Sequence, residues 1–536
     1  MIIANNLEKS FGAQSLFEGV SFLVNQGERV GLVGKNGAGK STLFKMILGQ
    51  ESPDSGTLSS PKGYRIDALE QIIRFTQPTV LKECIQALPA DKQWDHYKAE
   101  IILSGLGFSE QDFHKDPATF SGGYQIRINL CKALLANPNM LLLDEPTNYL
   151  DILSLRWLKE YLNKWPGEMV LITHDRDFMD SVTTHTLGLH RKQARKVKGG
   201  TIKYYEQIIQ EEETYELTRR NMESKKKEMQ ALIDRFRAKA SKATMAQSRM
   251  KMMEKMGTME KLETERNLGF KFNHLPCPGK TIMNIENLSF SYKGKDNIFS
   301  DISFSIGRKD RIGIIGANGK GKSTLLNCLA GELTPTSGTI TAHPSASPGH
   351  FGQTNIDRLE PENRVLDEIL RANPNLTLQA AHSICGVMLF GGDLSKKKVS
   401  VLSGGERSRL LLGKIISHRT NLLLLDEPTH HLDVESIETL IEELNDYDGA
   451  LVIVTHSELI LKTLAQSLII FHQGRAEYFN GGYDDFLEKV GWEEEQVAVK
   501  KTKTKVNKKE ARRLRALERQ KNPVSLTQDG HKRVNG

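Results

Sequence analysis

Two glycine-rich stretches carry residues suited to holding phosphate groups. The first reads Gly34-Lys35-Asn36-Gly37-Ala38-Gly39-Lys40-Ser41-Thr42, and the second reads Gly316-Ala317-Asn318-Gly319-Lys320-Gly321-Lys322-Ser323-Thr324. Glycine lets backbone N–H groups approach phosphate oxygens because it has no Cβ. We expect Lys40 and Lys322 to reach the β and γ phosphates of a nucleotide, and Ser41 and Ser323 to ligate Mg²⁺.

An acidic pair follows an apolar run downstream of each stretch. Asp144-Glu145 comes after residues 140–143, and Asp426-Glu427 comes after residues 422–425. Ligands of open α/β sheets bind at the carboxyl ends of the strands, so these side chains should lie near the phosphates. We expect the two aspartates to hold Mg²⁺ through water. Each glutamate is our candidate to orient and polarise the attacking water.

Two histidines complete the candidate chemistry. His174 and His456 each follow a further apolar run, Val170-Leu171-Ile172 and Leu451-Val452-Ile453-Val454. A histidine after a buried strand can be purely structural. Because each one accompanies a phosphate loop and an acidic pair, we favour a contact with the γ-phosphate and count both among the catalytic residues.

These motifs recur at one fixed offset. Each lies 282 positions after its first occurrence and in the same order, so the chain contains two copies of one domain. Apolar strands alternate with helices in both copies, which predicts an α/β fold with two P-loop domains in tandem. The predicted organisation is a first domain over 1–205, a helical linker over 206–279, a second domain over 280–490 and a basic C-terminal extension over 491–536.

The linker composition favours long helices. Residues 206–266 contain no proline and one glycine, and they are rich in Glu, Lys, Arg, Met and Gln. We expect two helices of roughly 30 residues each, about 45 Å long. They would form a projecting hairpin or, in the simpler alternative, a helical spacer.

The overall composition limits the classes of protein to which the chain can belong. No apolar run reaches the ~18 residues of a membrane span, the N-terminus lacks the pattern of a signal peptide, and the five cysteines are scattered. We therefore expect a soluble, cytoplasmic protein without a membrane domain of its own. Residues 500–536 carry 13 Lys/Arg against 3 Asp/Glu. Such a tail favours a polyanion such as nucleic acid, or it only aids solubility.

Taken together, the motifs resemble those of the ATP-binding cassette superfamily. Ser121-Gly122-Gly123 and Ser403-Gly404-Gly405 look like its signature motif, which contacts the γ-phosphate of ATP held by the opposite cassette. The resemblance also implies Q-loop glutamines that ligate Mg²⁺ (Gln71, Gln353), aromatics that stack on adenine (Phe11, Tyr292) and D-loop aspartates (Asp151, Asp433). It further implies a monomer whose cassettes pair head to tail around two ATP molecules.

A narrower resemblance is to the ABC-F subfamily, whose soluble members act on ribosomes. The linker looks like one that contacts P-site tRNA and rRNA, through a basic set consisting of Arg235, Arg237, Lys239, Lys242, Arg249 and Lys251. This resemblance implies a translation factor that binds the ribosomal E site with ATP and leaves after hydrolysis. The alternatives are the ATPase subunit of a membrane transporter and a DNA-binding or DNA-repair ABC-F ATPase.

The sequence also departs from the family pattern. Ser457-Glu458 follows His456 where Asp-Arg is usual, whereas the first copy keeps Asp175-Arg176. The first copy lacks the inserted arm of many relatives, because the Gln71–Ser121 spacing equals the Gln353–Ser403 spacing. We expect both sites to bind ATP and leave their relative hydrolysis rates open.

Overall fold

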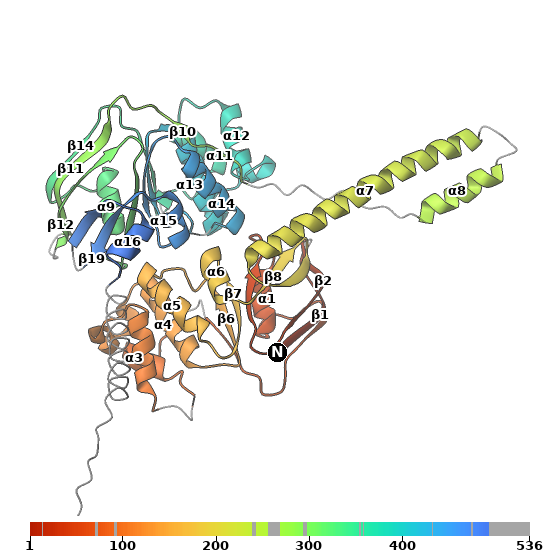
Figure 1. Ribbon diagram of the computed structural model, residues 1–536, viewed down its shortest axis with the longest axis horizontal. Helices are drawn as coiled ribbons and strands as arrows, with labels where there is room; N and C mark the ends of the chain where they lie inside the picture. The colour runs from red at the N-terminus through yellow and green to blue at the C-terminus, as the bar shows by residue number, and fades with distance from the viewer. Residues whose placement is uncertain are drawn as a thin grey trace, which may run out of the picture.

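The two sequence repeats form two similar α/β units that pack against each other. The computed structural model describes residues 1–12, 14–69, 73–89, 94–237, 243–255, 268–292, 297–352, 355–356, 358–430, 432–472 and 475–492. We call the unit built from residues 2–198 cassette 1 and the unit built from residues 281–489 cassette 2. Figure 1 shows them side by side, with helices α7 and α8 projecting away from both. The predicted tandem α/β organisation is confirmed.

A six-stranded sheet forms the centre of each cassette. Its order is β5-β6-β7-β3-β8-β9 in cassette 1 and β15-β17-β18-β13-β19-β20 in cassette 2, and the final hairpin of each sheet is antiparallel. The strands of cassette 1 are β3 (Arg29–Val33), β5 (Ile66–Ala68), β6 (Met140–Asp144), β7 (Glu168–Ile172), β8 (His185–His190) and β9 (Gln193–Lys198). Those of cassette 2 are β13 (Arg311–Gly316), β15 (Pro348–Phe351), β17 (Leu422–Asp426), β18 (Ala450–Val454), β19 (Ser467–His472) and β20 (Arg475–Phe479).

A smaller antiparallel sheet flanks each central sheet. It consists of β1 (Ile2–Phe11), β2 (Gln14–Val24) and β4 (Ser55–Ser59) in cassette 1. In cassette 2 it consists of β11 (Thr281–Ser291), β12 (Asn297–Gly307) and β14 (Ser337–Ala342). The short strands β10 (Asn273–His274) and β16 (Arg419–Thr420) pair in parallel. Cassette 2 thus repeats the strand order of cassette 1.

Helices cover the central sheets and begin at the motif residues. Cassette 1 contains α1 (Lys40–Ile47), α2 (Val80–Ile85), α3 (His96–Gly105), α4 (Gly122–Leu135), α5 (Ile152–Asn163) and α6 (Arg176–Val182). Cassette 2 contains α9 (Lys322–Leu329), α11 (Val365–Ala372), α12 (Leu378–Val387), α13 (Gly404–Ile416), α14 (Val434–Asp446), α15 (Glu458–Leu464) and α16 (Tyr483–Lys489). Strands β6 and β17 are buried along residues 140–143 and 422–425, as their uniform apolar sequence predicts.

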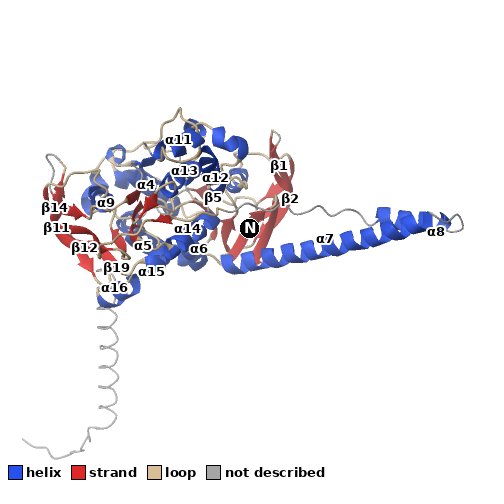
Figure 2. Ribbon diagram, turned by 90° about the horizontal axis from the view of Figure 1, so that it is seen from above, coloured by secondary structure: helices blue, strands red, loops and turns tan. Residues whose placement is uncertain are grey.

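The linker contains two helices within the described residues. Helix α7 (Thr201–Arg237) has 37 residues, and α8 (Ala243–Lys255) has 13. Helix α7 ends, and α8 begins and ends, next to residues outside the described part of the chain. Asp180 anchors the start of α7, because its carboxylate accepts hydrogen bonds from the Thr201 backbone N–H at 2.8 Å and hydroxyl at 2.9 Å. A helix of this length spans roughly 55 Å. Helix α7 starts beside β8 and β9, and Figure 2 shows its far end and α8 standing clear of the cassettes.

An apolar cluster joins the two cassettes near the end of the described chain. Ile152, at the start of α5, packs with Ile315, Tyr483, Phe486 and Trp492 of the second half. Trp492 is only 3% exposed. None of the helices in the described ranges combines the length and apolar composition that crossing a bilayer requires.

Candidate active site

The phosphate loops adopt a backbone that only glycine allows at several positions. Gly34 and Gly316 have φ of 154° and 144°. A Cβ there would meet the backbone oxygen of Leu189 at 2.8 Å or of Phe471 at 2.6 Å. By contrast, a Cβ added at Gly37 or Gly319 meets nothing within 4 Å. At the tip of each loop the backbone therefore faces open space.

Each loop lysine is folded back over its own loop. Lys40 Nζ donates to the carbonyl of Gly34 at 2.6 Å, and Lys322 Nζ donates to the carbonyl of Gly316 at 2.9 Å. Burial lowers the pKa of both lysines, and the nearest glutamate, Glu145 or Glu427, opposes this shift. A desolvated ammonium attracts an anion strongly, so each loop combines N–H donors with a positive charge.

The loop serines meet the strand-end aspartates. Ser41 Oγ donates to Asp144 Oδ2 at 3.2 Å. In cassette 2, Ser323 lies beside Asp426 in the equivalent position. Burial raises the pKa of both aspartates, and the serine hydrogen bond works against this rise. Each hydroxyl and carboxylate form an oxygen pair of the type that a hard divalent cation prefers.

The neighbouring glutamates leave their strands through a strained turn. Glu145 and Glu427 have φ of 52° and 47°, in the left-handed region. This turn carries each glutamate to the same sheet edge as the aspartate before it, although adjacent strand residues normally point to opposite faces. Burial, followed by the neighbouring aspartate, raises the pKa of both glutamates to about 8.

Both candidate histidines lie beside these glutamates. His174 Nε2 is 3.2 Å from Glu145 Oε1, and His456 Nε2 is 3.5 Å from Glu427 Oε1. Burial lowers the pKa of His456 well below its ordinary value. Its ring is therefore neutral, with the proton on Nε2, because that atom lies 3.0 Å from the acceptor Oδ1 of Asn318.

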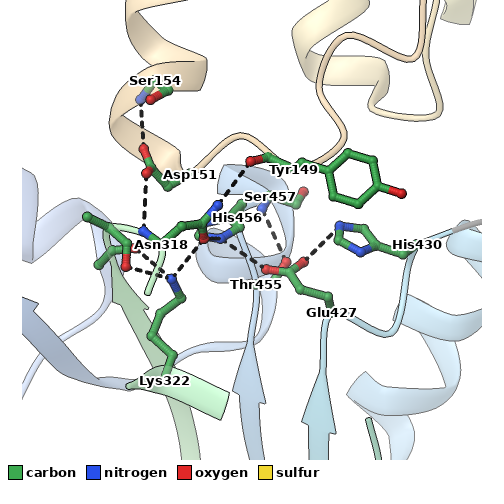
Figure 3. A network of polar contacts seen from close by, with 12 residues as sticks. Tyr149, Asp151, Ser154, Asn318, Lys322, Glu427, His430, Thr455, His456 and Ser457 are labelled. Carbon is green, nitrogen blue, oxygen red and sulfur yellow. Dashed lines mark hydrogen bonds and ion pairs between the residues drawn. The ribbon is translucent and has the colours of Figure 1, made fainter. Parts of the chain in front are cut away.

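One phosphate loop is also in direct contact with the other cassette. The Asn318 backbone N–H donates to Asp151 Oδ2 at 3.1 Å, and Asn318 Nδ2 donates to the carbonyl of Tyr149 at 3.0 Å. Figure 3 shows Tyr149 and Asp151 reaching from cassette 1 toward Asn318, Lys322 and His456 of cassette 2. We call this group, with Glu427, the Lys322 site.

A buried arginine stabilises the cassette 1 side of this contact. Arg127 in α4 donates to the carbonyls of Leu106 and Tyr149, both at 2.7 Å, and lies 3.5 Å from Asp151 Oδ2. Asp151 Oδ1 also caps α5 by accepting from the Ser154 N–H at 3.0 Å. The sequence analysis missed Arg127 and Tyr149. The repeat could have drawn attention to Arg127, because an arginine recurs 282 positions later.

The Lys40 site, which is the group of residues around the phosphate loop of cassette 1, is arranged differently. Asn36, which occupies the position of Asn318, is exposed and makes no cross-cassette hydrogen bond to the described residues. Asp433 caps α14 through the Ser436 N–H at 3.0 Å, and its charge reaches Lys40 without a direct bond. Lys35 pairs instead with Glu435 of cassette 2 at 3.0 Å. The two repeats therefore form unequal contacts.

The signature triplets lie at helix N-termini. Ser121 precedes α4 and Ser403 precedes α13, where free N–H groups favour an anion. Ser403 also forms a capping box with Glu406, whose carboxylate accepts from the Ser403 N–H at 2.8 Å. Contact of either triplet with the opposite loop remains a prediction.

The remaining predicted residues are placed in part. Phe11 and Tyr292 are 51% and 44% exposed, and the Tyr292 hydroxyl lies 3.5 Å from Thr324 Oγ1 of its own phosphate loop. Gln71 and Gln353 lie outside the described residues.

The predicted RNA contacts are also only partly described. Arg249 and Lys251 are exposed on α8. Lys239 and Lys242, the side chains of Arg235 and Arg237, and the basic tail after residue 492 lie outside the described part of the chain.

Comparison with known proteins identifies the family. Residues 17–148 and 299–430 match a family model described as ABC transporter, and residues 187–272 match a second model with that description. The probable ATP-binding protein YheS of Haemophilus influenzae is 34% identical, with 94% of this chain and 84% of that protein covered. ATP-binding cassette sub-family F member 3 of Mus musculus is 31% identical, with 90% of this chain and 72% of that protein covered. The chain belongs to the ABC-F subfamily.

Solved structures show the same fold at lower identity. The RNase-L inhibitor matches this ABC-F protein with a TM-score of 0.61 at 20% identity, covering 91% of this chain and 93% of that one. An archaeal ribosome recycling factor, aABCE1, matches with a TM-score of 0.62 at 20% identity, covering 91% and 92%. As a member of the ABC-F subfamily, the protein is an ATP-hydrolysing enzyme.

The residues of the two sites fit an ATP molecule with its metal ion. The open loop tips at Gly37 and Gly319 leave room for phosphates. The Oε1 atoms of Glu145 and Glu427 are buried, and His174 Nε2 and His456 Nε2 lie 3.2 Å and 3.5 Å from them. Mg²⁺, when bound, neutralises phosphate charge, and the Ser41–Asp144 and Ser323–Asp426 pairs are suited to hold it.

Proposed function

We propose that two ATP molecules bind between the cassettes and hold the protein in a closed form that associates with the ribosome. In each composite site, Lys40 or Lys322 binds the phosphates from one side. The opposite signature, Ser403-Gly404-Gly405 or Ser121-Gly122-Gly123, binds them from the other. The aromatics Phe11 and Tyr292 hold the adenine.

The observation that carries this proposal is the pair of hydrogen bonds from Asn318 to Asp151 and Tyr149. They link a phosphate loop of one cassette to the residues just after the acidic strand of the other, which is the head-to-tail relation that a shared site requires. Glu145 and Glu427 then orient the attacking water, and His174 and His456 contact the transferred phosphate. Loss of that phosphate removes contacts to both halves, so hydrolysis opens the clamp.

Ribosome association rests on subfamily membership and on the linker. Helices α7 and α8 project from the cassettes and present Arg249 and Lys251 to solvent. With Arg235, Arg237, Lys239 and Lys242 they would contact the phosphates of P-site tRNA and rRNA while the cassettes occupy the E site. This assigns the protein to the cytoplasm as a translation factor.

The test is co-sedimentation of a Glu145→Gln, Glu427→Gln double variant with ribosomes, with and without ATP. Slow hydrolysis prolongs the closed state, so we expect ATP to increase the ribosome-bound fraction by about tenfold or more. The matched control carries Lys40→Ala and Lys322→Ala in addition, which removes the phosphate contacts. ATP-dependent binding to DNA or to membrane vesicles, without ribosome binding, would contradict the proposal and support one of the alternatives.

A further inference from the structure

Among the described residues, three ion pairs cross between the cassettes with the same polarity. Lys35 pairs with Glu435 at 3.0 Å, Arg156 pairs with Glu458 at 3.0 Å, and Arg176 pairs with Glu438. In each pair the cation belongs to cassette 1 and the anion to cassette 2. This polarity distinguishes the two faces, although the faces derive from one repeated domain.

Two of these pairs are a single contact repeated by the internal symmetry. Arg156 in α5 and Glu438 in α14 occupy equivalent positions, 282 residues apart, and so do Arg176 in α6 and Glu458 in α15. The same two positions therefore meet twice across the interface. Cassette 1 supplies arginine at both positions, and cassette 2 supplies glutamate at both.

Neighbouring aromatic side chains hold these charges in place. The Arg176 guanidinium lies 4.5 Å from the ring centroid of Tyr205, and the Tyr483 hydroxyl donates to Glu458 Oε1 at 3.1 Å. The side chains of Arg156, Arg176 and Glu458 are 29%, 21% and 22% exposed. Partly buried charges with fixed side chains interact more strongly than free surface charges. Two like charges at these positions would therefore destabilise the interface strongly.

We infer that these ion pairs select cassette 1 as the partner of cassette 2 and reject pairing between like cassettes of two chains. Two copies of cassette 1 in the same arrangement would set Arg156 against Arg176 twice. Two copies of cassette 2 would set Glu438 against Glu458 twice. Because tandem repeats share one shape, a difference in charge adds to the specific contacts of Ile152 and Asn318 in separating the correct pairing from the wrong ones.

The inference explains the departure at Ser457-Glu458 from the usual family sequence. Glu458 stands where cassette 1 has Arg176, and this exchange is what makes the contact with Arg156 attractive. An arginine at position 458 would face Arg156 instead. The substitution is therefore part of the pairing surface, and it leaves His456 and Glu427 in place.

Charge reversal in the full-length chain tests the inference through oligomeric state. Variant A carries Arg156→Glu with Arg176→Glu, and variant B carries Glu438→Arg with Glu458→Arg. Each alone has like charges at both contacts within one chain, and pairing two identical chains does not relieve the repulsion. A mixture of A and B restores opposite charges only between chains. We expect light scattering to detect roughly tenfold more two-chain complex in the mixture than in A or B alone.

The combined fourfold variant supplies the decisive comparison. It restores opposite charges within one chain with reversed polarity, so we expect it to be monomeric, with the thermal stability of the original protein. The matched control, Lys98→Glu with Lys115→Glu, makes the same change in net charge at residues paired within cassette 1. The control should not form complexes with B. Equal complex formation by the mixture and by A alone, or a fourfold variant as impaired as A, would overturn the inference. Light scattering measures mass and does not depend on ATP hydrolysis. The oligomeric state can therefore still be interpreted if the proposed composite ATP sites prove wrong.

Discussion

At the scale of single residues, the reactive groups of the two sites are buried carboxyl groups. Glu145 and Glu427 have pKa values raised to about 8 by burial and by the neighbouring aspartates. Both residues also hold a left-handed backbone, with φ of 52° and 47°. The fold thus stabilises a buried carboxyl group and an unfavourable backbone conformation at the two positions where water activation is proposed.

These raised pKa values predict how stability depends on pH. Above the ordinary pKa of 4.5 the unfolded chain releases both protons while the folded protein keeps them, so stability falls as the pH rises toward about 8. The slope is at most about 1.4 kcal/mol per pH unit for each carboxyl. Glutamine has no proton to lose, so we expect Glu145→Gln to gain thermal stability over the original protein as the pH increases from about 5 to about 8.

Melting temperatures measured across this pH range check the prediction. Comparing each variant with the original protein at the same pH cancels the contributions of other groups, including the buried His456. Glu160→Gln, which removes an exposed carboxyl on α5, gives the control for the loss of one negative charge. A constant difference between Glu145→Gln and the original protein would show that burial does not raise this pKa.

At the scale of elements, the linker joins a long helical stem, α7, to a basic end, which is the set Arg235, Arg237, Lys239, Lys242, Arg249 and Lys251. The first residue of α7 is fixed by Asp180, and ion pairs such as Arg219–Glu216 and Arg219–Glu223 support the helix along its length. A stem held at its base can transmit a change in cassette position to the far end.

The basic residues of the linker carry a prediction separate from ATP hydrolysis. Reversal of Arg235, Arg237, Lys239, Lys242, Arg249 and Lys251 to glutamate should reduce ATP-dependent ribosome binding by about tenfold or more, because each phosphate contact adds to affinity. ATP hydrolysis by the protein alone should continue, since none of these residues belongs to the phosphate loops or to the acidic strand ends. Sedimentation and phosphate release measure the two properties.

A control on the same linker separates recognition from helix stability. Lys225→Glu with Lys227→Glu changes exposed charges on the α7 stem. This variant should keep ribosome binding within about twofold of the original protein. Equal losses in both variants would mean that overall linker charge, and not the basic end, governs association.

The sequence predicted the elements that carry regular local signals. Apolar runs identified β6 and β17, and the glycine pattern identified the loops before α1 and α9, because both signals lie within a few residues. Composition favoured helix in the linker but did not say where a helix begins, and α7 begins at Thr201. Arg127 escaped notice because its role depends on Tyr149 and Asp151, which approach it only in the folded chain.

At the scale of the whole molecule, the two halves are repeats that do not contact each other symmetrically. Asn318 reaches across to Tyr149 and Asp151, whereas Asn36 stays exposed. The apolar cluster of Ile152 with Ile315 and Trp492 lies on the side of the Asn318 contact. More of the described contacts therefore lie on the Asn318 side of the interface than on the Asn36 side.

This asymmetry predicts unequal responses to two equivalent substitutions. Asn318→Ala removes the side-chain bond to Tyr149, so amide hydrogen exchange in residues 147–151 should rise about fivefold in the absence of nucleotide, as expected for roughly 1 kcal/mol. Asn36→Ala removes no cross-cassette bond to the described part of the chain, and it should leave exchange in residues 429, 430, 432 and 433 unchanged. If ATP then closes both sites, the Glu145→Gln, Glu427→Gln protein should protect both segments to a similar degree. Equal exchange changes for the two alanine variants without ATP would mean that the clamp is symmetric at rest, and that its order of closure is set by the nucleotide alone.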